Sequence, residues 1–101
     1  MSKTLKIPTA VRFGFKFTVP VQRVAKMPGK SGEYFFFDNP DGCRIDISGA
    51  EPTWEQIDAY GHEVVHAAID FCRYLQREYV TPMRLEAERT AIELAQDKKG
   101  E

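Results

Sequence analysis

Residues 53–78 read TWEQIDAYGHEVVHAAIDFCRYLQRE, and most of what can be expected of the fold follows from this segment. Its apolar side chains recur at the spacing of an amphipathic helix. Thr53 and Gln56 fit a capping box, which satisfies backbone donors left unpaired in the first turn. The pattern predicts a helix from about Trp54, a packing anchor, to Glu78. Its broad apolar face is made of Ile57, Tyr60, Gly61, Val64, Ala68, Phe71, Cys72 and Leu75.

A second helix is expected directly after the first. Pro82 disfavours helical geometry in the residue before it, so the first helix should stop ahead of it. Thr81 then serves as the N-cap of a new helix, with Pro82 at its first position. This helix should reach about Gln96, before the charged residues 97–101. We therefore expect two helices joined by a short turn.

The first half of the chain follows the two-residue period of β-strands. Residues 11–19 alternate strictly between apolar and polar or small side chains, which predicts one strand buried on one face. Pro20 would remove a ladder donor, so a continuation into Val21–Val24 must bend or lie at an edge. The side chains expected in the core between sheet and helix are those of Phe13, Phe15 and Phe17.

A hairpin should follow this strand. The apolar runs Tyr34–Phe37 and Cys43–Ile47 flank the turn-forming stretch Asp38–Gly42. The fold class is therefore α+β, with a small, mostly antiparallel sheet of three or four strands followed by two helices. The sheet half covers residues 1–50 and the two-helix half residues 53–97.

Length and composition favour one soluble domain. The chain has 101 residues, of which 43% are hydrophobic, and a net charge of −1. This length suits a single domain over residues 1–101. No apolar run approaches the roughly 20 residues that cross a bilayer, and the first residues lack the apolar segment of a signal peptide. We expect a cytoplasmic protein with no membrane span.

The only two histidines lie inside the first predicted helix, in the sequence His62-Glu63-Val64-Val65-His66. Four residues apart on a helix, two imidazoles lie one turn above each other and can grip one zinc ion. Glu63 is rotated by about 100° from His62, where its carboxylate meets zinc-bound water instead of crowding the ligands. The pattern predicts zinc ligation by His62 and His66, with Glu63 as the catalytic base. The alternative is a pair of surface histidines beside a solvated glutamate.

Two protein ligands seldom complete a zinc site, so a third is expected. Cys72, six residues after His66, would lie about 15 Å along an unbroken helix from His62, which is out of reach. A carboxylate from the second helix is the other solution. Glu88 is favoured because it lies inside an apolar stripe, where a buried acid needs a cation. Glu86 is the alternative. The stripe is made of Leu85, Ala91, Ile92 and Ala95.

Three segments together resemble a known family. They are CRIDIS at 43–48, GHEVVHAAI at 61–69 and LEAERTAIEL at 85–94. They look like a minimal zincin metallopeptidase of the gluzincin type, a kind of small HExxH protein frequent in bacteriophage and bacterial genomes. The resemblance covers about residues 43–95.

This resemblance implies a fold and a set of site residues. His62, His66 and Glu88 would hold zinc, Glu88 matching the glutamate of an E-x-x-A stretch on the next helix. Glu63 would act as the catalytic acid and base. The last strand of the sheet would border the substrate cleft, where an extended peptide binds by strand addition.

Further residues have open roles around such a site. No other histidine is left to stabilise an oxyanion, so a tyrosine or an arginine would have to serve. Asp70, one turn beyond His66, either orients that imidazole or is solvated. The oxyanion candidates are Tyr34, Tyr60, Tyr79 and Arg89.

The expected function is zinc-dependent hydrolysis of a peptide or protein substrate. The first alternative is a catalytically silent, zinc-stabilised binding or assembly module encoded by a phage. The second is a nucleic-acid-binding domain, since residues 1–50 carry eight Lys/Arg against four Asp/Glu. Those cations form no cluster on a predicted face, which argues against nucleic acid. Alternate members of Tyr34–Phe37 must face away from the core, so a homodimer or a protein partner is expected at exposed aromatic surface.

Overall fold

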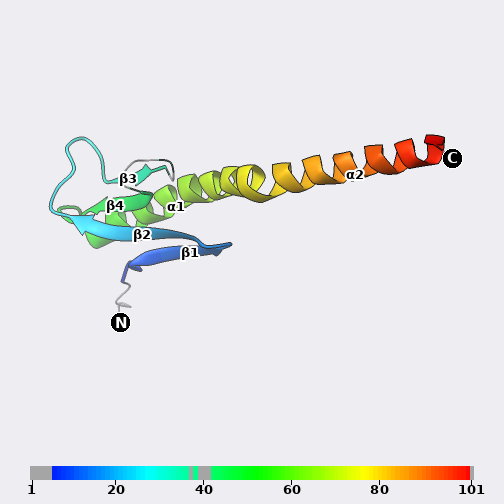
Figure 1. Ribbon diagram of the computed structural model, residues 1–101. Coiled ribbons are helices and arrows are strands. Elements are labelled where there is room, and N and C mark those ends of the chain that lie inside the picture. The colour runs from blue at the N-terminus through cyan, green and yellow to red at the C-terminus, as the bar shows by residue number, and fades with distance from the viewer. Residues whose placement is uncertain (1–5, 37, 39–41, 101) are drawn as a thin grey trace. The chain divides into compact units, whose positions relative to one another are not determined.

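The computed structural model describes residues 6–36, 38 and 42–100 (Figure 1). The chain divides into two compact units, Met1–Phe71 and Cys72–Glu101. This boundary lies inside the first helix and not between the predicted sheet and helix halves. The first unit contains the four strands and most of the first helix. In chain order the elements are β1 (Ala10–Gly14), β2 (Phe17–Val24), β3 (Gly32–Phe35), β4 (Arg44–Ser48), α1 (Thr53–Leu75), η1 (Gln76–Val80) and α2 (Thr81–Gly100).

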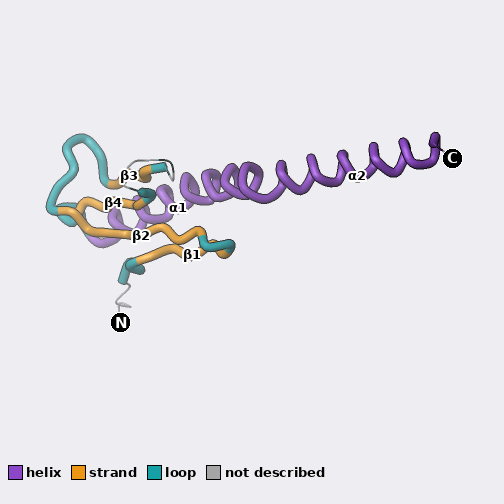
Figure 2. Tube along the Cα trace, viewed as in Figure 1, coloured by secondary structure: helices purple, strands orange, loops and turns teal. Residues whose placement is uncertain are grey.

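The four strands form one sheet in the order β1-β2-β4-β3. β1 pairs with β2, and β3 with β4, in antiparallel fashion, while β2 and β4 are parallel. The α+β class with a mostly antiparallel sheet is therefore confirmed (Figure 2). The predicted hairpin is confirmed as well, with Phe35 opposite Arg44. The turn predicted over Asp38–Gly42 includes residues 39–41, which lie outside the described residues.

The alternating stretch 11–19 is a hairpin and not the single strand predicted. Gly14 at the end of β1 lies opposite Phe17 at the start of β2. The chain reverses through Phe15 and Lys16, whose φ angles are 51° and 61°. Positive φ at both central residues gives a two-residue loop the twist that neighbouring strands need. Phe15, expected in the core, is 59% exposed at this turn. The alternation of apolar and polar side chains continues through Phe15 and Lys16, so the sequence pattern gives no sign of the turn.

Pro20 lies where β2 changes its partner. Pairing with β1 ends at Ala10 opposite Pro20, and pairing with β4 begins at Val21 opposite Ile45. At Pro20 the strand therefore has a neighbour on one side only. This matches the edge position predicted for a residue that has no backbone N–H.

The buried face of α1 differs from the apolar face predicted for this helix. The predicted face is half-buried or exposed, with Gly61 and Cys72 both exposed. The helix approaches the sheet through two alanines and three polar residues, because small side chains allow close packing at that face. The buried residues of α1 are Gln56, Ala59, Glu63, Ala67 and Asp70.

Aromatic side chains close the core beside this face. Phe71 of α1 lies 5.2 Å from the ring centroid of Phe13 and 5.4 Å from that of Phe17. Phe17 is buried, whereas Phe13 and Phe71 are half-buried. Full burial of one such ring is worth about 1.5–3 kcal/mol, and the two half-buried rings contribute less each. The sheet side of the core consists of Phe17, Val19, Val21, Tyr34, Ile45 and Ile47.

Two contacts bring the edge strand β3 against α1. Gly32 lies so close to the helix that an added Cβ would be 3.2 Å from Cγ of Glu63 and 3.1 Å from Cδ1 of Ile47. The Tyr34 hydroxyl donates a hydrogen bond of 2.5 Å to Asp70, which is only 2% exposed. Both contacts join β3 to the polar face of α1.

The two predicted helices are joined by a π-helical segment in place of a turn. Gln76–Val80 form η1, and the flanking residues Leu75 and Thr81 keep helical dihedral angles. The N–H of Thr81 donates to the carbonyl oxygen of Gln76, five residues back. This wide turn precedes Pro82 and relieves the clash that a proline ring makes inside a regular helix.

The second unit contains α2, whose described side chains are exposed. Leu85 and Ile92, members of the stripe predicted around Glu88, are exposed with the rest. Within the part of the chain described, no helix combines the length and the apolar character needed to cross a membrane.

Substitution of Gly32 tests the close approach of β3 and α1. Gly32→Ala should lower the free energy of unfolding by about 1–3 kcal/mol, because the added methyl group overpacks the contact with Glu63 and Ile47. The matched control is Gly61→Ala on α1, where an added Cβ meets no atom within 4 Å. That variant should gain up to about 1 kcal/mol from helix propensity. Urea unfolding measures both, and equal effects of the two alanines would contradict the packing described.

The hydrogen bond between Tyr34 and Asp70 predicts a loss of stability at alkaline pH. Burial and the Asp70 carboxylate raise the pKa of Tyr34 above its ordinary value of about 10. The folded state therefore retains this proton at pH values where the unfolded chain has released it. The free energy of unfolding should fall as pH rises above about 10, by at most about 1.4 kcal/mol per pH unit.

Tyr34→Phe isolates this contribution. At pH 7 it should cost about 1–3 kcal/mol, because the buried Asp70 carboxylate loses the hydrogen bond from the Tyr34 hydroxyl. Above pH 10 its free energy of unfolding should fall less steeply than that of the wild type. Tyr60→Phe, which keeps the pair, is the matched control and should retain the wild-type slope. Identical slopes for Tyr34→Phe and wild type in urea titrations would exclude the pair as the cause.

Candidate metal centre

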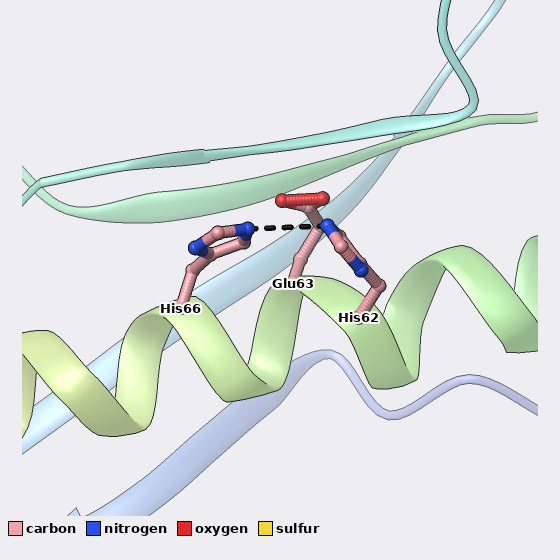
Figure 3. A group of neighbouring side chains, drawn as sticks. All are labelled: His62, Glu63 and His66. Carbon is pink, nitrogen blue, oxygen red and sulfur yellow. Dashed lines mark hydrogen bonds between the residues drawn. The ribbon is translucent and has the colours of Figure 1, made fainter.

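Three side chains from two successive turns of α1 meet at one point. His62, Glu63 and His66 each offer a ligand atom, and these atoms lie within 4.8 Å of one another. Figure 3 shows the two imidazoles projecting from the same side of the helix with the Glu63 carboxylate beside them. The i, i+4 spacing of the histidines produces this arrangement, as predicted from the sequence.

The distance between the two imidazoles fits a shared ion. The Nε2 atoms of His62 and His66 are 3.1 Å apart. Two nitrogen ligands at 2.0–2.1 Å from a tetrahedral zinc ion are about 3.3–3.4 Å apart. Both rings are exposed, so a further ligand, water or a substrate atom can reach the ion from outside. The donor set and its geometry therefore fit a metal centre with an open position, and they leave the metal's identity undetermined.

Glu63 has a different environment from the two histidines. It is only 6% exposed, and its packing against Gly32 holds its chain against β3. Among the described residues no hydrogen bond or ion pair accompanies its carboxylate. The carboxylate oxygens are not among the fully buried atoms without a partner, because Glu63 lines an open cleft beside His62. Water or a cation in that cleft can therefore reach the carboxylate.

A cleft of about 340 Å³ opens beside His62 and Glu63. One wall is formed by residues 30–32, at the start of β3, and the other by residues 54–63 of α1. β3 is the edge strand here, and β4 lies between β2 and β3. The expectation that the last strand borders the cleft is therefore wrong for β4. The edge position belongs to β3, because β4 pairs with β2 on one side and with β3 on the other.

The predicted third ligand lies in the second unit. Glu88 and its alternative Glu86 are both on α2, and both are exposed. The group of ligand side chains found together consists of His62, Glu63 and His66. Glu88 as a zinc ligand stays a prediction.

The oxyanion candidates fall in different parts of the chain. Tyr34 lies in β3, with its hydroxyl bonded to Asp70. Asp70 is buried, so its interpretation as a solvated carboxylate is wrong. Tyr60 is half-buried on α1. Tyr79 and Arg89 belong to the second unit.

Trp54 and Asp58 are among the cleft residues that were not predicted from the sequence. Trp54, expected as a packing anchor, is 70% exposed and lines the cleft together with Asp58. The signal was available in the spacing, because residues 54, 58 and 62 lie four apart and share one side of a helix with the first histidine.

Comparison with known proteins adds no relative. A scan against protein-family models, a search of curated proteins and a search of solved structures each return no match to this chain. The geometry of His62, Glu63 and His66 is thus the only basis on which the site can be interpreted.

Proposed function

We propose that this protein is a zinc-dependent peptidase that hydrolyses a peptide bond at the centre formed by His62, Glu63 and His66. The observation that carries the proposal is the 3.1 Å separation of the two imidazole Nε2 atoms beside a buried carboxylate. Neither feature alone suggests hydrolysis. Together they provide metal ligands and a proton acceptor within 4.8 Å of one another. Metal-assisted hydrolysis requires both kinds of group.

The chemistry is divided between the ion and the side chains. Zinc bound by His62 and His66 would lower the pKa of a water toward about 7 and polarise the scissile carbonyl. Glu63 accepts a proton from the attacking water while the water oxygen bonds to the carbonyl carbon. It then passes that proton to the amine nitrogen as the C–N bond breaks. Burial against Gly32 restricts the Glu63 side chain to few orientations, which favours both transfers.

The third ligand stays a prediction, with Glu88 favoured by the E-x-x-A pattern at residues 88–91. Glu86, two residues earlier, is the alternative.

The substrate in this proposal is an extended peptide laid along the open edge of β3. An edge strand offers unpaired backbone groups for strand addition, and the cleft wall at residues 30–32 leads into this strand. The cytoplasmic location and the homodimer or protein partner at exposed aromatic surface stay predictions.

Metal content and turnover test the proposal. Protein purified without nickel resin or chelator should contain about one zinc per chain, and His66→Ala should lose it. Glu63→Gln should retain the zinc, because its carboxylate is not needed as a ligand. Its kcat for a peptide library should fall by about 10²–10⁴-fold, the usual contribution of a general base.

The outcomes separate the functions considered. Equal hydrolysis by wild type and Glu63→Gln would overturn the catalytic role. Bound zinc with no hydrolysis of any library peptide would favour the zinc-stabilised binding or assembly module. Absence of zinc from the wild type, with none taken up on addition, would leave the two histidines a surface pair.

Substitutions on α2 test the third ligand. Glu88→Gln should weaken zinc binding by at least about tenfold, since it replaces a charged ligand by a neutral amide. The matched controls are Glu86→Gln and Glu93→Gln, which make the same change on the same helix. Competition with a chromophoric chelator measures the affinities. A loss of zinc affinity confined to Glu86→Gln would identify Glu86 as the third ligand. Equal zinc affinities of the three variants and the wild type would exclude all three glutamates of α2 as ligands.

A further inference from the structure

The cleft beside the metal centre has an unusual lining for a surface hollow. Its α1 wall carries Trp54, whose indole is 70% exposed, and the acidic residues Glu55 and Asp58. Its far end is formed by His62 and the buried Glu63. An exposed tryptophan loses apolar contacts that it would gain in a core, so its position at a cleft wall favours a ligand that packs against it.

The charges that face this cleft are mainly negative. Glu55, Asp58 and Glu63 contribute three carboxylates, and Lys30 is the single cation of the lining. Lys30 is already paired with the carboxylate of Glu33. The Glu55 carboxylate accepts a hydrogen bond from the neutral hydroxyl of Ser31 and shares a side-chain hydrogen bond with Glu51. No described residue forms a hydrogen bond or an ion pair with Asp58.

The negative charge of the cleft also affects Glu51, which lies just outside it. The carboxylate of Glu55 raises the pKa of the Glu51 carboxyl, and Lys26 only partly offsets this effect. A cation that binds beside Glu55 would therefore relieve this repulsion as well as gain attraction.

We propose that this cleft is a specificity pocket for a lysine or arginine side chain of the substrate peptide, held by Asp58 and by the face of Trp54. The inference rests on the proposed function, because it assigns the side chain that enters beside the scissile bond. Carboxylates and an aromatic face together suit a cation with an aliphatic stem. The stem packs on the indole while the charge reaches Asp58.

The position of the cleft fits a side chain of a peptide on β3. Residues 30–32 of the cleft wall lead directly into this edge strand. In a strand added to β3, alternate side chains point toward α1. One of them, close to the bond held at His62, would enter the cleft between Gly32 and Asp58.

Trp54 is the only tryptophan of the chain, so its fluorescence reports on this cleft alone. The experiment titrates zinc-loaded Glu63→Gln protein with synthetic octapeptides, in which lysine is moved through each position of one neutral sequence. Methionine and glutamate versions of each peptide serve as references. The best lysine peptide should bind at least about fivefold tighter than its methionine version, and tighter still than its glutamate version. Because the pocket is partly exposed, 0.5 M salt should reduce the preference.

Variants test which side chain is responsible. Asp58→Asn should bring the ratio of lysine to methionine affinity close to one. Asp97→Asn, the same change on the exposed surface of α2, is the matched control and should leave the ratio as in the parent protein. Trp54→Phe, followed by calorimetry, should lower the lysine affinity by about two- to fivefold. Lysine, methionine and glutamate peptides of equal affinity, or a preference that survives Asp58→Asn, would overturn the pocket.

The binding assay and the hydrolysis assay distinguish failure of the pocket proposal from failure of the peptidase proposal. A wild-type protein that hydrolyses peptides without any preference for a basic residue keeps the proposed function and loses the pocket. A protein that prefers lysine peptides in the binding assay but does not hydrolyse them loses the peptidase function and keeps the pocket.

Discussion

The close packing of the edge strand β3 on α1 is the constraint on which the candidate site depends. It turns a polar face of the helix inward, so that Glu63 is buried while His62 and His66 remain exposed one turn apart. Gly32 leaves the space for this approach, and the bond from Tyr34 to Asp70 satisfies a second buried acid. Had the helix buried its most apolar face, Glu63 would point away from β3 and the cleft would not form.

Much of this arrangement could be predicted from the sequence because it is local. A helix over Thr53–Leu75 follows from periodicity and a cap, and the meeting of the two imidazoles follows from i, i+4 spacing alone. The hairpin of β3 and β4 follows from two apolar runs around a turn. Each of these features involves residues near in sequence, whose geometry the backbone of one element determines.

The features that could not be predicted depend on contacts between elements. Apolar periodicity identified a face of α1 but not its rotation toward the sheet, which the small side chains of Ala59 and Ala67 decide. Alternation through Phe15 concealed a turn, because nothing in Phe15-Lys16 has the composition usual at positive φ. The parallel pairing of β2 with β4 leaves no local signal at all. The prediction of Glu88 as a third ligand has no test of this kind, since Glu88 lies in the second unit.

The mixed sheet has a consequence for the order of folding. The hairpin of β1 and β2 joins residues 14 and 17, whereas the parallel ladder joins Val21 to Ile45 and the β3–α1 contact spans 36 residues. Non-local pairings form more slowly than local ones, because the intervening loop must first be closed at an entropic cost. The histidine pair needs only α1, whereas the cleft also needs β3. A metal ion held by the pair would therefore also bind a partly folded chain that contains α1, and this affinity would reduce how much the ion stabilises the native state.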